Sequence, residues 1–169
     1  MKPKIFFISF LLILMVSGRL WAQSTVTAEM YAEIISALTA QENQPLSFGR
    51  FSPEATGGMI QIRPDGVRQA QGAVIPTGAE HTPASFYVTG HLKAQFEVIL
   101  PEGPVMLYRE GGSESMTVRD FIVDENNGIW ILDDGTKVVN LGATLEVGSL
   151  EENPTGMYAG TYSIIFLYY

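Results

Sequence analysis

The sequence predicts an all-β fold, a sandwich or barrel of short strands, and three observations support this. Apolar residues recur at every second position through most of the chain after residue 22. No long stretch repeats convincingly at the helical period. Gly, Pro, Asn and Asp interrupt the pattern at short intervals, as they do in folds of many short strands.

The N-terminus has the three parts of a secretion signal. Lys2 and Lys4 form a basic start, residues 5–16 are apolar except for Ser9, and Ser17-Gly18-Arg19 ends the run. The run is shorter than the roughly 20 residues that a membrane-spanning helix needs. We therefore predict a cleavable signal peptide over residues 1–22, with cleavage after Ala22, and a single domain over residues 23–169. The protein is expected in the periplasm, at the cell surface or outside the cell.

Composition restricts the classes of partner. The net charge is −8, and removal of residues 1–22 takes away three cationic residues and no acid, which leaves −11. Such a chain repels phosphates, so neither nucleic acid nor an anionic membrane surface is an expected partner, and stable membrane insertion is not expected. The chain has no cysteine, which excludes disulfides, thiolate metal sites and a lipid-modified cysteine. No cofactor is expected.

The first predicted strand covers residues 25–38. Its apolar positions lie on one face, namely Val26, Ala28, Met30, Ala32 and Ile34. A helix over residues 28–40 is the alternative, because Ala, Glu and Met favour helices. The alternation favours the strand.

Further strands are predicted over residues 46–51, 59–63, 67–70, 85–89, 94–100, 105–108, 116–123, 129–132, 137–147 and 157–169. Three tight turns have hairpin chemistry, because they carry residues that favour turns or tolerate positive φ. They are Arg63-Pro64-Asp65-Gly66, Asn126-Asn127-Gly128 and Asp133-Asp134-Gly135.

The C-terminal strand has the most informative pattern. One face carries Tyr158, Gly160, Tyr162, Ile164, Phe166 and Tyr168. Both faces are apolar near the end of the chain, which predicts a strand that is buried or paired on both sides. It is either a final core strand or a strand that a partner recognises.

No residue pattern predicts catalysis or metal binding. His81 and His91 have no neighbouring histidine to complete a metal site, and we expect both in exposed loops. The acidic turns at Asp124 and Asp133 lack the ligand spacing of a calcium loop. There is no nucleophile elbow and no phosphate-binding loop, so an enzyme is not expected.

Five segments occur in a specific order along the chain after the signal. They are Leu46-Ser47-Phe48-Gly49, the stretch from Thr82 to Gly90, the stretch from Phe96 to Pro101, the stretch from Leu141 to Gly148 and the stretch from Gly156 to Tyr162. In this order they resemble the DUF4402 family of exported bacterial proteins, and the resemblance covers nearly all of the chain after the signal. The resemblance implies an exported Ig-like antiparallel β-sandwich and no catalytic residues.

The last strand also resembles that of chaperone–usher pilus subunits. Tyr168 is penultimate, Gly156 is fourteenth from the end, and Tyr162, Ile164 and Phe166 alternate between them. This resemblance implies an incomplete sandwich that accepts a strand from a periplasmic chaperone and then from a like subunit. Residues 25–38 are then the donor strand, which pairs either within its own chain or with another.

We therefore predict a non-enzymatic structural or adhesive surface subunit, pilin-like and assembling by strand exchange. One alternative is a carbohydrate- or protein-binding module that presents Trp130, Tyr87 or Tyr108. The other is a small outer-membrane β-barrel, which the aromatic C-terminal strand favours. Strands shorter than the roughly 9 to 11 residues of such barrels, and charges at Glu97 and Arg119, oppose it.

Overall fold

The computed structural model describes residues 26–124 and 129–169, in two units that comprise residues 1–34 and 35–169. The predicted signal peptide, its cleavage point and the Asn126-Asn127-Gly128 turn lie outside the described residues. In the first unit, residues 26–34 form neither helix nor strand, and their side chains are exposed.

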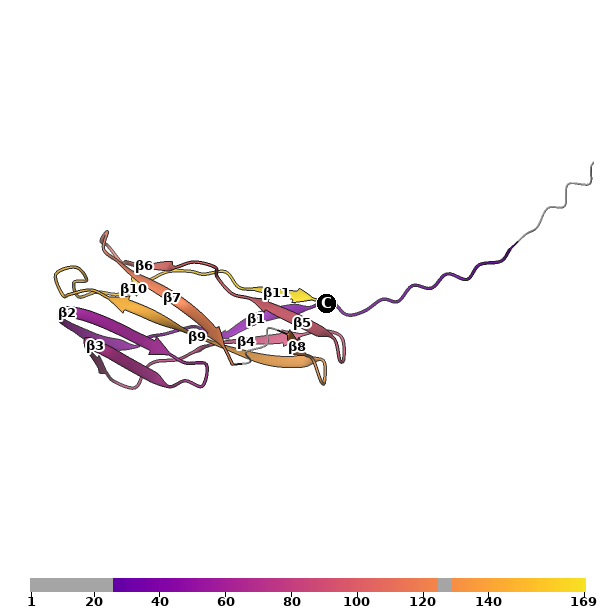
Figure 1. The fold of residues 1–169 in the computed structure, drawn as a ribbon, viewed down its shortest axis with the longest axis horizontal. Coiled ribbons are helices and arrows are strands. Elements are labelled where there is room, and N and C mark those ends of the chain that lie inside the picture. Colours follow the sequence, from indigo (N-terminus) through magenta and orange to yellow (C-terminus); the bar gives the residue numbers. More distant parts are fainter. Residues whose placement is uncertain (1–25, 125–128) are drawn as a thin grey trace, which may run out of the picture. The chain divides into compact units, whose positions relative to one another are not determined.

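The second unit is built from strands, and no helix occurs among the described residues, which confirms the predicted all-β class (Figure 1). The strands are β1 (Thr39–Gln44), β2 (Arg50–Ile62), β3 (Arg68–Thr77), β4 (Ala84–Thr89), β5 (Gln95–Ile99), β6 (Val105–Arg109), β7 (Ser115–Val123), β8 (Ile129–Ile131), β9 (Thr136–Val147), β10 (Tyr158–Ala159) and β11 (Ile165–Tyr168).

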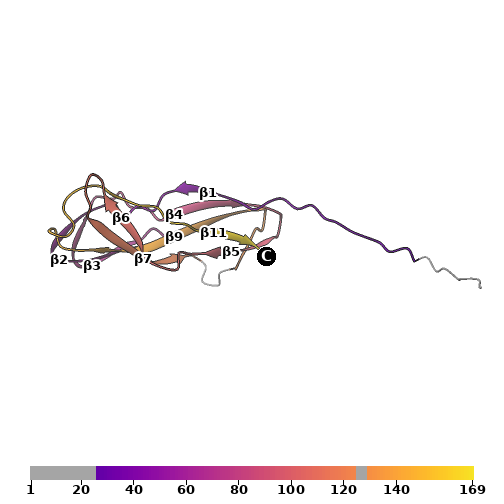
Figure 2. The same cartoon turned by 90° about the horizontal axis from the view of Figure 1, so that it is seen from above.

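The strands form two antiparallel sheets, which confirms the predicted sandwich arrangement (Figures 1 and 2). The large sheet has the order β1-β4-β9-β7-β6-β10, and β2 joins it by pairing with both β9 and β3. The small sheet has the order β11-β5-β8. Its strands are only three to five residues long, so it is much shorter than the sheet that it faces.

Strand β9 is the centre of the large sheet. Along one edge it pairs first with β4 and then with β2, and along the other edge it pairs with β7. The change of partner falls at Gly142, where a Cβ atom would overlap the carbonyl oxygen of Ile62. Glycine is required here because two backbones approach closely.

Alternate side chains of β9 supply both hydrophobic clusters of the core. Core cluster 1 contains Phe48, Ile60, Ile62, Val74, Met116, Val118, Ala143, Leu145 and Val147. Core cluster 2 contains Ala84, Phe86, Val88, Phe96, Val98, Trp130, Leu132, Val139 and Leu141. The small sheet contributes to core cluster 2 alone, so the large sheet's other half is covered by different parts of the chain.

Two predicted turns are present, but only one of them closes a hairpin. Arg63-Pro64-Asp65-Gly66 joins β2 to β3 as predicted, with a hydrogen bond of 2.9 Å from the Gly66 amide to the Arg63 carbonyl. Asp133-Asp134-Gly135 is also a tight turn, with Gly135 at φ 83°. It joins β8 to β9, which lie in different sheets, so the hairpin prediction is wrong there.

Two strand predictions near the start of the domain are wrong. Within the predicted strand 25–38, residues 26–38 form no strand, and β1 begins only at Thr39. The alternation is real, but a strand also needs a neighbour to pair with. The predicted strand 46–51 is irregular up to Gly49, whose φ of 75° breaks the extended backbone before β2 begins.

The single C-terminal strand predicted over residues 157–169 is also wrong. It is two short strands, β10 and β11, which lie at the edges of different sheets and are separated by residues 160–164. The prediction of burial on both sides is wrong as well, because β11 pairs with β5 alone and Ile165 and Leu167 are 55% and 49% exposed. Only the face with Phe166 and Tyr168 packs on core cluster 2.

The Tyr168 hydroxyl ties three separated parts of the domain together. It donates a hydrogen bond of 3.0 Å to the Ser36 carbonyl and accepts one of 2.7 Å from the His91 amide. Gly90 makes room for it, because a Cβ at that position would overlap the hydroxyl. The start of the domain and its last strand are therefore held at one end of the sandwich.

We predict that Tyr168→Phe lowers the free energy of unfolding by about 1 kcal/mol, because the ring stays while both hydrogen bonds are lost. Tyr169→Phe is the matched control. The Tyr169 hydroxyl reaches only the exposed Glu97 carboxylate, so we expect a change within about 0.5 kcal/mol. Urea unfolding of the two variants measures the difference, and equal stabilities would contradict the assigned role of Tyr168.

Candidate functional site

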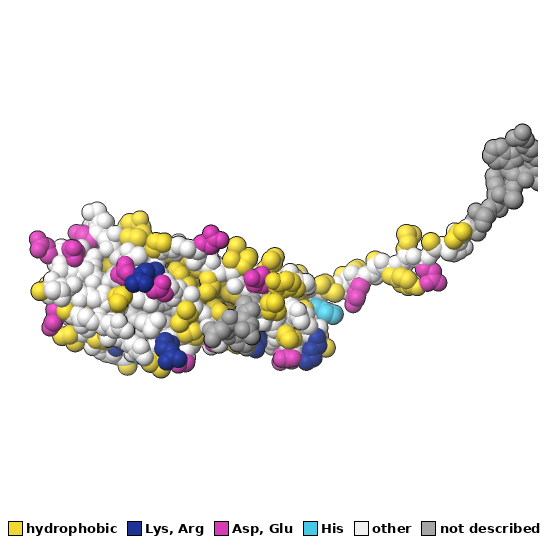
Figure 3. Space-filling model, in the orientation of Figure 1, with side chains coloured by type: hydrophobic (Ala, Val, Ile, Leu, Met, Phe, Trp, Pro, Cys, Tyr) yellow, Lys and Arg dark blue, Asp and Glu magenta, His cyan; other side chains and the backbone are white. Residues whose placement is uncertain are grey.

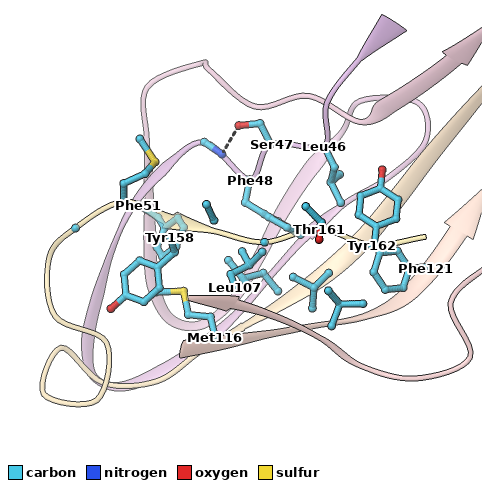
Figure 4. A pocket seen from close by; sticks show the side chains of 18 residues that line it. Leu46, Ser47, Phe48, Phe51, Leu107, Met116, Phe121, Tyr158, Thr161 and Tyr162 are labelled. Carbon is cyan, nitrogen blue, oxygen red and sulfur yellow. Dashed lines mark hydrogen bonds between the residues drawn. The ribbon is translucent and has the colours of Figure 1, made fainter. Parts of the chain in front are cut away.

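The candidate site is a cavity of about 320 Å³ over core cluster 1 (Figure 4). Its floor is formed by β6, β7 and β9, through Val105, Leu107, Met116, Val118, Phe121 and Leu145. At about 30 Å³ per water molecule, the volume corresponds to roughly ten waters. Because the floor is apolar, an apolar occupant would be favoured over water.

The first wall of the cavity is residues 46–51. Ser47 and Thr82 exchange two backbone hydrogen bonds of 2.9 Å in an isolated bridge, and Arg50 and Phe51 begin β2 and pair with β3. The Ser47 hydroxyl accepts a bond of 3.3 Å from the Gly49 amide, and the Phe48 side chain turns inward to the floor (Figure 4). The wall is therefore held by backbone pairing on both sides of Phe48 and Gly49.

The second wall is residues 156–162, and it begins at an anchored loop. Asn153 is buried, and its carboxamide accepts a bond of 2.6 Å from the Gly148 amide and donates one of 2.9 Å to the Ser115 carbonyl. The Tyr158 hydroxyl then donates to the Pro154 carbonyl at 2.9 Å. These bonds fix where the C-terminal part of the chain enters the site.

The second wall is also where the C-terminal strand is interrupted. Residues 160–164 belong to no strand, although β10 precedes them and β11 follows. A Cβ at Gly160 would overlap the Met106 carbonyl, so glycine allows the chain to pass close to β6 at this point. An extended backbone without a neighbour offers unpaired amides and carbonyls, which is the chemistry that accepts an added strand.

Tyr162 stands at the inner end of this wall, with its ring 5.5 Å from that of Phe121. Its hydroxyl is buried and has no hydrogen-bond partner within residues 26–124 and 129–169. Burial, reinforced by the negative charge of Glu42, raises the pKa of Tyr162 to about 12. The phenol is therefore neutral at physiological pH and leaves a donor unused beside the cavity.

The N-terminal segment, residues 26–34, carries apolar side chains that are fully available. Val26, Met30 and Ile34 are 83%, 94% and 97% exposed. Figure 3 shows these side chains in yellow along the segment, with acidic side chains in magenta between them. Isolated exposed apolar residues are ordinary, but a regular row of them is typical of a surface that binds another.

Comparison with known families gives one match. The family described as "Domain of unknown function (DUF4402)" matches residues 38–168. The chain belongs to the DUF4402 family. No curated protein and no solved structure matches it. The family resemblance predicted from five sequence segments is thereby confirmed, and the DUF4402 match begins just before β1 and ends in β11.

The structure separates the predicted partner-strand residues of this DUF4402 protein into three places. Gly156 and Tyr162 line the cavity. Ile164, Phe166 and Tyr168 pack against core cluster 2. Val26, Ala28, Met30, Ala32 and Ile34 lie in the N-terminal segment. Sequence reasoning missed the cavity floor, because residues such as Leu107 and Met116 have the ordinary signal of core positions.

The other candidates from the sequence have structural explanations in the DUF4402 domain. The Lys93 ammonium lies 2.7 Å from the Asp133 carboxylate and lowers its pKa. Asp134 accepts bonds from the Thr136 side chain and amide, which lower its pKa. His91 is exposed as expected, whereas the expectation for His81 is wrong because its ring is partly buried. Among the described residues, no three possible ligands gather as a metal site.

The prediction that Trp130 is one of three exposed stacking aromatics is wrong. Trp130 is 1% exposed and stacks on Phe96 in core cluster 2, with ring centroids 6.2 Å apart. Tyr87 and Tyr108 are 45% and 57% exposed, but they lie on β4 and β6, which β9 and β7 separate. These tyrosines do not form a common platform.

The outer face of the small sheet is a second unusual surface of the DUF4402 domain. Ile165 is paired directly with Ile99, and both side chains point outward with Leu167 and Ile129. Hydrophobic side chains gather over β11 and β5 in Figure 3. No helix in the described part of the chain is long and apolar enough to cross a membrane.

Alkaline titration tests the environment of Tyr162. Because its pKa is raised from 10.0 to about 12, the phenol is neutral in both states below pH 10. Between pH 10 and 12 the unfolded chain ionises first, so stability is lost as the pH rises through this window, by about 2 kcal/mol after allowance for partial exposure.

We expect ultraviolet titration of the folded protein to show a tyrosine that ionises near pH 12, and Tyr162→Phe to remove it. The same variant should resist alkaline unfolding better than the parent. Tyr158→Phe is the control, because the Tyr158 hydroxyl has a partner and its loss should reduce stability. A tyrosine that still ionises near pH 12 in Tyr162→Phe would contradict the assignment.

Proposed function

We propose that this protein is an exported, non-enzymatic structural or adhesive surface subunit that assembles by β-strand exchange. The N-terminal segment acts as the donor strand, and the partners are like subunits, delivered by a periplasmic chaperone. The single observation that supports this most strongly is the presence of an open cavity over core cluster 1 together with a strand-like segment whose apolar side chains are exposed.

The first support is the state of core cluster 1. Phe48, Met116 and Leu145 are at most 7% exposed, yet a cavity opens beside them and no strand of the small sheet reaches them. The cavity opens to solvent, so it can take the side chains of an added strand.

The second support is the pattern of the N-terminal segment. A strand that adds to a sandwich needs apolar side chains at alternate positions on one face and a free backbone. Residues 26–34 have both, since they belong to no sheet and alternate from Val26 to Ile34. Glu29 and Glu33 lie on the opposite face, which would remain in water.

Light scattering coupled to size-exclusion chromatography tests the proposal. The protein is exported with its own signal and compared with a variant that lacks residues 26–34. We expect a series of oligomers from the parent and only monomer from the truncated protein. The control replaces Thr27, Glu29 and Glu33 by Gln, which changes the opposite face and should leave assembly intact. A parent protein that stays monomeric at high concentration, alone and with a chaperone, would contradict the proposal.

A protein-binding module is the second candidate, and the apolar outer face of the small sheet favours it. In that case the functional surface is centred on Ile99 and Ile165 and does not involve the N-terminal segment. Ile165→Lys separates the two candidates. It should leave strand exchange unchanged, whereas a module that binds through this face would lose its partner.

A further inference from the structure

We propose that the cavity between residues 46–51 and 156–162 is the acceptor, and that its occupant is the N-terminal segment of a second copy of this chain, with Met30 seated on the cavity floor. This inference rests on the proposed function. It adds which part of the domain accepts the strand, which copy supplies it, and which side chain enters.

The backbone chemistry at the cavity fits an added strand. Residues 160–164 run without a sheet neighbour along the cavity's second wall, and Gly160 and Thr161 are exposed there. An incoming strand would pair with the amides and carbonyls of residues 160–164, in the interval between β10 and β11.

The length of the donor fits the acceptor. The second wall comprises residues 156–162, which span roughly 23 Å at about 3.3 Å per residue. Residues 26–34 span roughly 30 Å when extended, by the same measure. The segment is therefore long enough to run the full length of the cavity with a residue to spare at either end.

The chain between the donor and β1 opposes pairing within one copy. Residues 35–38 link the N-terminal segment to β1, and a segment that returned over its own domain would need a tight turn within this link. The intervening Ile35-Ser36-Ala37-Leu38 contains no Gly, Pro, Asn or Asp, which are the residues that make tight turns. Ser36 is also held by the Tyr168 hydroxyl, and Leu38 packs on core cluster 2. A second copy has no such constraint.

Met30 is the side chain best suited to the cavity floor. It is central in the alternating row and has the longest flexible side chain of the five, and thioethers fill irregular gaps well. The lining is rich in aromatic rings, including Phe48, Phe121 and Tyr158, and sulfur packs favourably against such rings. Figure 4 shows Phe48 between Tyr158 and Phe121 along the cavity.

Disulfide trapping tests the inference, and the absence of native cysteine makes the engineered pair unambiguous. The variant carries Met30→Cys together with Leu107→Cys, whose parent leucine lines the floor. The matched control carries Tyr31→Cys with Leu107→Cys, because Tyr31 lies on the opposite face of the donor. Both proteins are oxidised in a glutathione buffer and separated on a non-reducing gel.

We expect the Met30 variant to form a ladder of covalently linked copies and the Tyr31 control to form roughly tenfold less, as a change of face removes the contact. A disulfide within one copy would overturn the inference, as would equal ladders from both proteins. If light scattering shows oligomers but no cross-link forms between positions 30 and 107, the assignment of this cavity as the acceptor is wrong and the proposed function is unaffected. The absence of both oligomers and cross-links would contradict the inference and the proposed function alike.

A second variant keeps the test independent of how Leu107→Cys folds. Thr161→Trp places an indole at the exposed mouth of the cavity, and Ser113→Trp places one in an exposed turn away from it. With both proteins melting at the parent temperature, we expect Thr161→Trp to weaken assembly by at least roughly tenfold, the loss of one well-packed contact. Unchanged assembly in Thr161→Trp would overturn the inference.

Discussion

The length of β9 is the constraint on which the rest of the structure depends. Its twelve residues carry side chains of both core clusters, whereas the strands of the small sheet have five, three and four residues. A sheet of that length covers the half of β9 around Val139 and Leu141 and cannot reach Leu145. The other half is therefore covered by residues 46–51 and 156–162, whose only strand residues are the first two of β2 and the short β10.

The way in which the chain closes that half explains the cavity. Residues 46–51 and 156–162 converge from opposite ends of the sequence, and neither pairs continuously with the sheet below. Irregular segments satisfy few of their own backbone groups, so they cannot pack as closely as a strand. Gly49, at φ 75°, and Gly160, which lies against the Met106 carbonyl, allow this path and leave the space between the walls unfilled.

Period-two alternation identified the strands of the interior from sequence, because β5 and β7 bury alternate side chains, although residues 141–145 of β9 are buried on both faces. The same signal failed over residues 26–38, since alternation shows that a segment is suited to pairing but not whether a neighbour exists. It also merged β10 and β11, because the interruption at residues 160–164 depends on how β6 passes beneath Gly160. The cavity itself follows from the difference in length between the two sheets. The residue types at positions 107 and 116 do not indicate that difference.

Under the proposed function, a partner accounts for the exposed apolar row of the N-terminal segment. A row of exposed apolar side chains contributes nothing to the folding of its own chain and exposes a surface that favours association. Glu29 and Glu33 on its opposite face limit indiscriminate pairing, as charges do on natural edge strands. Under the proposed function, the link from Ile35 to Leu38, which the Tyr168 hydroxyl holds at Ser36, would disfavour return of the donor to its own cavity, so that the cavity would accept a second copy.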